Sequence, residues 1–188
     1  MSRHMGERRE ASGGGIRWTV LAVLAGVLLA VLLRLFVIGV YYVPSGSMLD
    51  TIHEGDLILG ERVSLAFGEP SQGDVVTFTS PLDPDETLVK RVIAVGGQTV
   101  DLVDGAVYVD GERLDEPYVS SWPTVSLSDL EGSAGITYPY VVPEGCVWVM
   151  GDNRTNSRDS RYFGPVSVDD VTSRAILIYW PLPNVGLL

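Results

Sequence analysis

Residue types that commonly build reactive sites are nearly missing from this chain of 188 residues. It has one cysteine, Cys146, so an internal disulfide and a cysteine-rich metal centre are both excluded. Cys146 lies in an apolar run, and we expect a buried, unreactive thiol. Histidine occurs only as His4 and His53, which excludes a histidine-rich metal site. We therefore expect neither a metal nor a cofactor.

Lysine is scarce as well, because Lys90 is the only one among 13 basic residues. Arginine cannot act as a base, since it stays charged at any working pH. Strand alternation over 88–95 places Lys90 beside Leu88 and Val92. Aliphatic neighbours remove water from an ammonium group and lower its pKa. Lys90 is thus the candidate nitrogen base, and a lysine reaching into water from an edge strand is the alternative.

Charge and hydropathy divide the chain into unequal parts. The formal net charge is −11, yet the first 34 residues hold five arginines and only two acidic residues. The acidic remainder has no basic stripe, which argues against nucleic-acid binding. Residues 16–38 are almost wholly apolar and long enough to cross a bilayer. A cleavable signal peptide is the alternative, but the run is too long and no small-residue cleavage site follows it.

These features predict a disordered cytoplasmic tail at 1–15, a transmembrane anchor at 16–38 and an extracytoplasmic domain at 39–188. Arginines precede the apolar span, and the positive-inside rule therefore places the N-terminus in the cytoplasm. The chain is expected to be a single-pass protein of the cell membrane with its large domain outside.

The outer part of the sequence is typical of β structure. Two Asp-Gly pairs, at 104–105 and 110–111, predict tight hairpin turns, and no segment keeps a helical period beyond a turn or two. Residues 119–136 are interpreted as a polar surface excursion. Short β-branched runs between turn signals predict strands at 36–43, 56–63, 74–80, 87–95, 99–103, 106–109, 137–142, 146–150 and 172–180.

Two polar segments are candidates for chemistry. In the turn 44–48, Pro44 and Gly46 favour a backbone that presents the Ser47 hydroxyl and leaves N–H groups pointing at one spot, as a nucleophile with an oxyanion site requires. An ordinary surface loop is the alternative there. Residues 151–164 carry more hydrogen-bonding groups than a plain turn needs. We expect ion pairs between Asp152 and Arg91 and between Asp159 and Arg161, and a bond from Ser157 to the Lys90 amine, with a solvated loop as the alternative.

Taken together, these segments resemble the ordered signature boxes of bacterial type I signal peptidases at 44–48, 73–76, 90–93 and 151–162. The resemblance spans about residues 36–180. It implies an all-β domain of antiparallel sheets with one N-terminal transmembrane helix. It also implies a serine endopeptidase that removes signal peptides from secreted preproteins at Ala-x-Ala sites on the outer membrane face. Its partners would be preproteins and the lipid bilayer, with the secretion translocon as a further candidate.

The resemblance also implies roles for individual residues. Ser47 would be the nucleophile, Lys90 the general base, and Ser157 the residue that orients Lys90. The Ser45 hydroxyl and the Ser47 N–H would form the oxyanion hole. Structural support would come from Arg91, Asp152, Asp159 and Arg161. A shallow apolar pocket for a small side chain would be lined by Val43, Met48, Ile52, Leu88 and Val89.

Three other interpretations stay open at this stage. His53 is the only histidine in the domain that could serve as a base, although we expect it to be exposed. The chain could be another Ser–Lys peptidase, such as a self-cleaving repressor or a pilin- or sortase-associated processing enzyme. It could also be a non-enzymatic anchored β domain that binds a partner.

Overall fold

The computed structural model describes residues 13–120 and 123–188, and the chain divides into two units between Val37 and Ile38. The first unit holds one helix, α1 (Gly13–Phe36), in which Gly15–Arg34 is long and apolar enough to cross a membrane. The helix begins three residues before the predicted span, so Gly13–Gly15 of the predicted tail are helical. Residues 1–12 of that tail lie outside the described residues.

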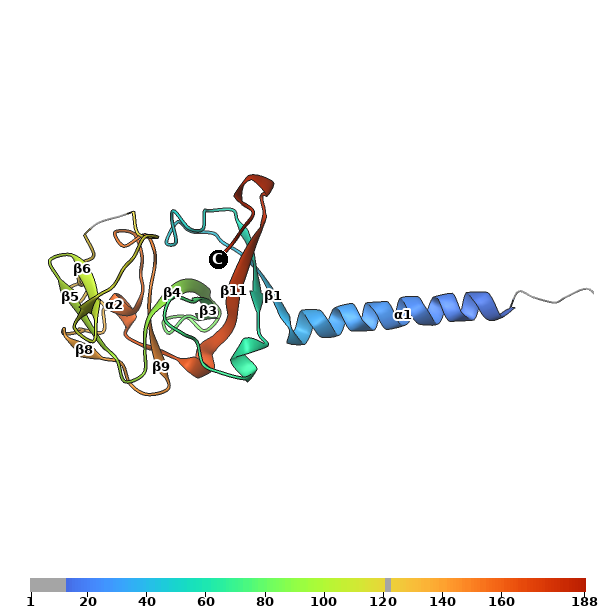
Figure 1. Cartoon of the computed structure of the whole chain (residues 1–188), viewed down its shortest axis with the longest axis horizontal. Coiled ribbons are helices and arrows are strands. Elements are labelled where there is room, and N and C mark those ends of the chain that lie inside the picture. The colour runs from blue at the N-terminus through green and yellow to red at the C-terminus, as the bar shows by residue number, and fades with distance from the viewer. Residues whose placement is uncertain (1–12, 121–122) are drawn as a thin grey trace, which may run out of the picture. The chain divides into compact units, whose positions relative to one another are not determined.

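The second unit is a β domain in which every described strand pair is antiparallel, which confirms the predicted fold class (Figure 1). The larger sheet has the order β1-β2-β11-β3-β4-β9-β10, with β12 added to β11. Its strands are β1 (Ile38–Tyr42), β2 (Leu57–Glu61), β3 (Val75–Thr79), β4 (Thr87–Val95), β9 (Cys146–Met150), β10 (Val166–Ser167), β11 (Val171–Trp180) and β12 (Gly186–Leu187).

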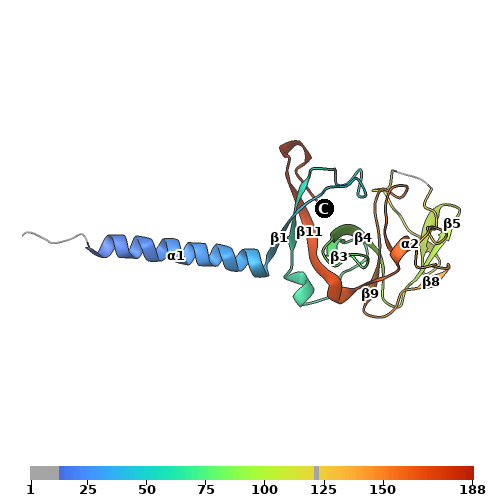
Figure 2. The same cartoon turned by 180° about the vertical axis from the view of Figure 1, so that it is seen from behind.

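A smaller sheet with the order β7-β6-β5-β8 lies beyond β9, on the side away from β1 and β11 (Figures 1 and 2). Both predicted hairpins are present, because Asp104-Gly105 and Asp110-Gly111 adopt the positive φ angles that tight hairpin turns need. The strands of this sheet are β5 (Thr99–Val103), β6 (Ala106–Val109), β7 (Glu112–Arg113) and β8 (Tyr140–Val141).

All nine predicted strands occur, although the segment 137–142 forms only the two-residue β8. The sequence did not indicate β7, β10 or β12, each of two residues, or the short helix α2 (Ser160–Phe163). Such brief elements carry too little periodicity to be recognised. The three strands form because longer neighbouring strands offer them backbone partners, whereas α2 is capped by the Asp159 side chain.

Strand β4 contributes to all three apolar cores of the domain. Val92 belongs to the core around Phe78, Ile93 and Ala94 to the core around Trp148, and Val89 packs against the core that holds Met48. On one side β4 pairs with β3 from Thr87 onward, but on its other side it pairs with β9 only from Arg91 onward. Its first residues, 87–90, therefore keep one backbone edge unpaired within the described sheet, in the region that forms the candidate site.

Candidate active site

The loop that carries Ser47 is tied at both ends and anchored in the core. Val43 and Asp56 close its base through a backbone hydrogen bond of 2.9 Å. Met48 and Ile52 are fully buried with Val43 and Ile58. Ser47 lies between these anchors and remains partly exposed. The predicted turn thus presents a serine hydroxyl on a fixed backbone.

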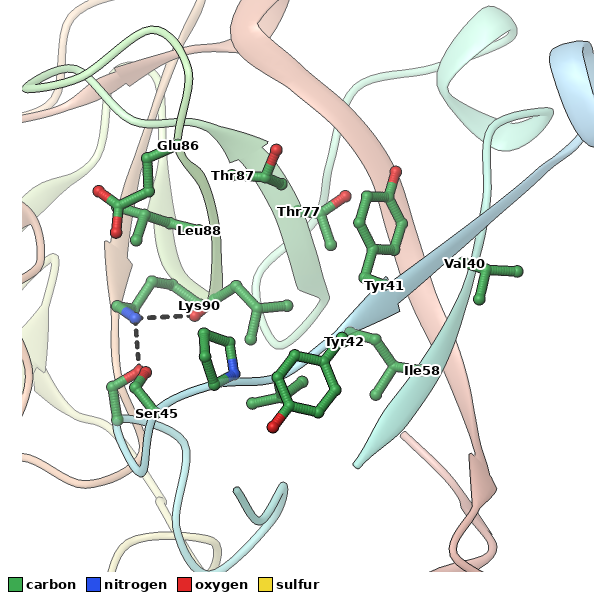
Figure 3. A pocket seen from close by; sticks show the side chains of 14 residues that line it. Val40, Tyr41, Tyr42, Ser45, Ile58, Thr77, Glu86, Thr87, Leu88 and Lys90 are labelled. Atoms are coloured by element: carbon green, nitrogen blue, oxygen red, sulfur yellow. Dashed lines mark hydrogen bonds between the residues drawn. The ribbon is translucent and has the colours of Figure 1, made fainter. Parts of the chain in front are cut away.

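Lys90 points at this serine from β4. Its side chain is nearly buried, with 3% of the residue exposed. The Nζ atom lies 2.7 Å from Ser47 Oγ and 2.9 Å from the backbone oxygen of Val89 (dashed lines in Figure 3). Within the described chain, Lys90 forms no ion pair. Burial lowers its pKa to about 8, against the opposing effects of Asp159, Glu86 and Asp152.

His53 has no comparable position. Its side chain is half exposed, and its backbone N–H donates to the Asp56 carboxylate over 2.8 Å. The exposure agrees with the expectation from the sequence. Lys90, and not His53, donates the hydrogen bond that Ser47 Oγ accepts. The geometry therefore favours a serine–lysine arrangement over one based on histidine.

The loop 151–159 clamps the serine loop through contacts that the sequence did not indicate. The Asn153 side-chain amide donates to the Gly46 carbonyl over 2.9 Å, and the Asn153 N–H donates to the Ser47 carbonyl over 3.1 Å. Thr51 donates to the Asp152 carboxylate over 2.6 Å. The only sequence signal for Asn153 was its place in the polar run beside Asp152. No pattern indicated Thr51.

Both predicted ion pairs are present and buried. Arg91 donates two hydrogen bonds to Asp152, of 2.9 and 2.7 Å, and its guanidinium lies 4.0 Å from the Tyr118 ring centroid. Arg161 makes two hydrogen bonds of 2.9 Å to Asp159. A third buried pair, between Arg154 and Glu116, was not predicted. These pairs fix the polar loop in one conformation.

The predicted excursion 119–136 is tied to the polar loop rather than being simply solvated, in the part that the structure describes. Thr124 is buried and accepts from Arg154 over 3.1 Å, and the Val125 carbonyl accepts from Arg161 over 3.2 Å. Residues 121–122 lie outside the described residues. The excursion therefore covers the side chains that hold the polar loop.

Ser157 and Ser45 occupy different positions beside the pair. Ser157 Oγ is buried without a hydrogen bond of standard geometry to any described residue, and none joins it to Lys90. It adjoins Gly151, where a Cβ atom would overlap both Ser157 Oγ and the Ser47 carbonyl oxygen. Burial alone would raise the pKa of Asp159, but Arg161, the Gly151 N–H and the Ser157 hydroxyl hold it below its usual value. Ser45 is exposed and lies near Lys90 (Figure 3).

Two cavities meet at Ser47 and Lys90. Cavity 1, of about 320 Å³, is mainly apolar and extends from Lys90 to Val40 along β1 and β4 (Figure 3). Cavity 2, of about 420 Å³, is lined by more polar groups, from residues 80–88 and 156–163. Ser45, Ser47, Glu86, Leu88 and Lys90 line both.

The predicted pocket residues divide between the wall of cavity 1 and the core behind it. Val43, Leu88 and Val89 line the cavity. Met48 and Ile52 do not, because they point inward and are 0% exposed. Their apolar character is equally typical of core residues, so the sequence could not separate the two places. The lining residues that the sequence did not indicate are Val40, Tyr41, Tyr42, Pro44, Ile58, Thr77, Glu86 and Thr87.

No group of three or more acidic, histidine or cysteine side chains that could hold a metal occurs among the described residues. Cys146 is half-buried against the core around Trp148.

Comparison with known proteins identifies related sequences over most of the chain. The family described as signal peptidase, peptidase S26, matches residues 16–180. The probable signal peptidase I-1 of Synechocystis is 36% identical over 180 residues, covering 92% of this chain and 87% of that protein. The signal peptidase I of Mycobacterium tuberculosis is 37% identical, covering 97% and 78%. A crystal structure of a signal peptidase I from Enterococcus faecalis is 32% identical and covers 57% of this chain and 97% of its own, with a TM-score of 0.47.

Proposed function

Because this chain belongs to the signal peptidase family, peptidase S26, and is therefore a serine peptidase that removes signal peptides, we propose that Ser47 and Lys90 perform the cleavage. The observation that carries this assignment is the 2.7 Å separation of Lys90 Nζ and Ser47 Oγ in a nearly buried setting. A pKa of about 8 leaves a useful fraction of neutral amine near neutral pH.

The neutral Lys90 amine takes the Ser47 proton as Oγ attacks the carbonyl carbon of the scissile peptide bond. The resulting ammonium then gives a proton to the leaving amine, so the peptide C–N bond breaks and an acyl-serine remains. Lys90, neutral again, takes a proton from water, and the hydroxide attacks the acyl carbon. The bond between Oγ and the acyl carbon then breaks, the Lys90 ammonium returns its proton to Oγ, and release of the leader carboxylate leaves Ser47 and neutral Lys90 as they began.

The residues around the pair complete the proposed machinery. The Ser47 N–H and the exposed Ser45 hydroxyl bind the oxyanion, and the Asn153 clamp keeps the Ser47 backbone in place. Ser157 is the proposed base-orienting residue, because its buried hydroxyl adjoins the Ser47 backbone and makes no hydrogen bond of standard geometry within the described chain. Arg91, Asp152, Asp159 and Arg161 act as structural support through their buried ion pairs.

Cavity 1 is the proposed site for the leader residues before the scissile bond. β1 is the terminal strand of its sheet, and residues 87–90 of β4 pair only with β3, so both have a free edge for an extended peptide. Val43, Leu88 and Val89 form a shallow apolar wall there, with Met48 and Ile52 behind it. This wall suits the small side chains of Ala-x-Ala sites.

The N-terminal helix anchors the enzyme to the membrane. We place residues 1–15 in the cytoplasm, the anchor at 16–38 and the catalytic domain at 39–188 outside, since arginines precede the span. The substrates are preproteins whose leaders lie in the same bilayer, and the secretion translocon is the expected neighbour that delivers them.

The test uses the full chain reconstituted in vesicles with a model preprotein carrying an Ala-x-Ala site. Ser47→Ala and Lys90→Met should each lower kcat/KM by at least about a thousandfold, because each removes a reacting group. Ser71→Ala, at an exposed serine that lines neither cavity, is the matched control and should cleave normally. Normal cleavage by either active-site variant would refute the assignment, and cleavage that tolerates leucine in place of both alanines would refute the specificity.

A further inference from the structure

Cavity 2 has a more polar wall than cavity 1 and takes no part in the proposed binding of the leader. To the residues that the two cavities share it adds the polar Ser80, Asp83, Asn156 and Arg158, together with Gly46, Leu82 and Phe163. Polar and charged groups of both signs therefore form part of the wall of a space of about 420 Å³ directly beside Ser47 and Lys90. A peptide whose scissile bond lies at Ser47 and Lys90 must occupy both cavities, with one cavity on each side of that bond.

Building on the proposed function, we infer that cavity 2 binds the first residues of the mature protein and that Arg158 there favours an acidic side chain. The position of the anchoring helix in the sequence indicates which cavity holds the leader and which holds the mature part. Cavity 1 extends along β1 to Val40, and only Val37 separates β1 from the anchoring helix. The leader keeps its apolar segment in the same membrane, so it fills cavity 1, and the mature part leaves through cavity 2.

Arg158 is the cation in cavity 2 that is available to a substrate. Its guanidinium lies 4.7 Å from the centroid of the Tyr162 ring, which restricts its orientation. In the described chain it forms no ion pair, whereas Arg91, Arg154, Arg161 and Arg174 each face a carboxylate. Arg158 is exposed, and an arginine that lines a cavity without forming an ion pair is suited to bind a carboxylate through a bidentate contact.

The two carboxylates of the cavity determine which mature residue meets Arg158. Glu86 lines both cavities and so borders the scissile bond, where it disfavours an acidic first residue. Asp83 accepts a hydrogen bond of 3.0 Å from the Asp85 N–H in its own turn. Arg158 lines cavity 2 but not cavity 1. The favoured acidic side chain is therefore expected at the second mature residue, one step away from Glu86.

The experiment measures kcat/KM of the vesicle-reconstituted full chain for three preproteins that differ only in the second mature residue, which is Glu, Gln or Lys. The wild type should prefer Glu over Lys by about two- to fivefold, the usual strength of a solvent-exposed ion pair. Arg158→Gln should remove this preference and Arg158→Glu should invert it. Salt at about 0.5 M should weaken the preference by screening.

Arg113→Glu is the matched control, because Arg113 is an exposed arginine in β7 that does not line cavity 2. It should keep the wild-type ratio. A ratio of one for the wild type, or the same ratio for Arg158→Glu and Arg113→Glu, would overturn the inference. Each ratio is taken within one variant, so it does not depend on the amount of folded enzyme. Failure of the proposed function would appear separately, as cleavage of the Gln substrate by Ser47→Ala.

Discussion

Lys90 and Arg91 are neighbours on β4 with almost the same burial, 3% and 9% exposed, but they have opposite electrostatic surroundings. Lys90 faces a serine hydroxyl and a backbone carbonyl, and burial lowers its pKa to about 8. Burial would also lower the pKa of Arg91, but the two hydrogen bonds and the charge of Asp152 raise it instead. Whether a buried cationic side chain keeps its proton therefore depends on whether it faces a carboxylate or only neutral groups.

The alternation of the strand creates this difference. Arg91 is held between Asp152 and the Tyr118 ring, where its charge stabilises the polar loop. Lys90 is directed to the free edge of the sheet, where aliphatic groups surround it and no carboxylate lies within ion-pair distance in the described chain. One residue of the pair is therefore suited to fix structure and the other to exchange a proton.

The strongest way to break this comparison is Lys90→Arg, which keeps the cation and removes its ability to lose a proton. We expect kcat/KM for a model preprotein to fall by about a thousandfold or more, as with loss of a general base. Arg113→Lys, at an exposed position, is the control for the exchange of these two residue types. Substantial cleavage by Lys90→Arg at pH 8 would show that a neutral amine is not required.

Features that depend on local sequence were predicted better than contacts between residues far apart in the chain. Lys90, its aliphatic strand and the Asp-Gly hairpins depend on local patterns of a few residues, and the structure has them. The pairs of Arg91 and Arg161 were predicted from the dense polar segment 151–164 and are present. The contacts of Asn153 with Gly46 and of Arg154 with Glu116 join residues far apart in the chain. Local sequence periodicity carries no information about such contacts. It also could not distinguish Met48 and Ile52, which lie in the core, from Val43, which lines the cavity.

Asp152→Asn sharpens the other half of the comparison, because it leaves the buried Arg91 charge without its counter-charge. We expect the free energy of unfolding to fall by about 3 kcal/mol, in the range for breaking a buried pair, as measured by denaturant unfolding of the full chain in detergent. The control is Asp74→Asn, which breaks an ion pair between Asp74 and Arg174 whose side chains are 21% and 27% exposed, respectively. This variant should lower the free energy of unfolding by less than about 1 kcal/mol. Equal losses for the two variants would mean that burial of the Arg91 pair has no special effect.

The pH dependence of cleavage tests the lowered pKa directly. In the proposed mechanism only the neutral amine of Lys90 acts as a base, so kcat/KM should rise about tenfold per pH unit below pH 8 and level off above it. Tyr41 lines the same cavity. Burial opposes ionisation of its phenol, but hydrogen bonds with Ser173, Thr77, Thr172 and Arg62 lower its pKa to about 8 as well. Tyr41→Phe removes this second group and should leave the midpoint of the profile near pH 8.

Glu86→Gln makes the smallest change, because it alters the surroundings of Lys90 without touching the reacting atoms. The Glu86 carboxylate raises the pKa of Lys90, so its removal should move the rising limb toward lower pH. Glu86 is exposed to solvent, which screens its charge, and we expect only about a twofold gain in kcat/KM at pH 7 for a substrate with uncharged residues after the scissile bond. The matched control is Glu69→Gln, at another exposed glutamate that lines neither cavity. A limb that moves toward higher pH in Glu86→Gln would contradict the assignment of the titrating group to Lys90, because loss of a nearby negative charge cannot stabilise an ammonium.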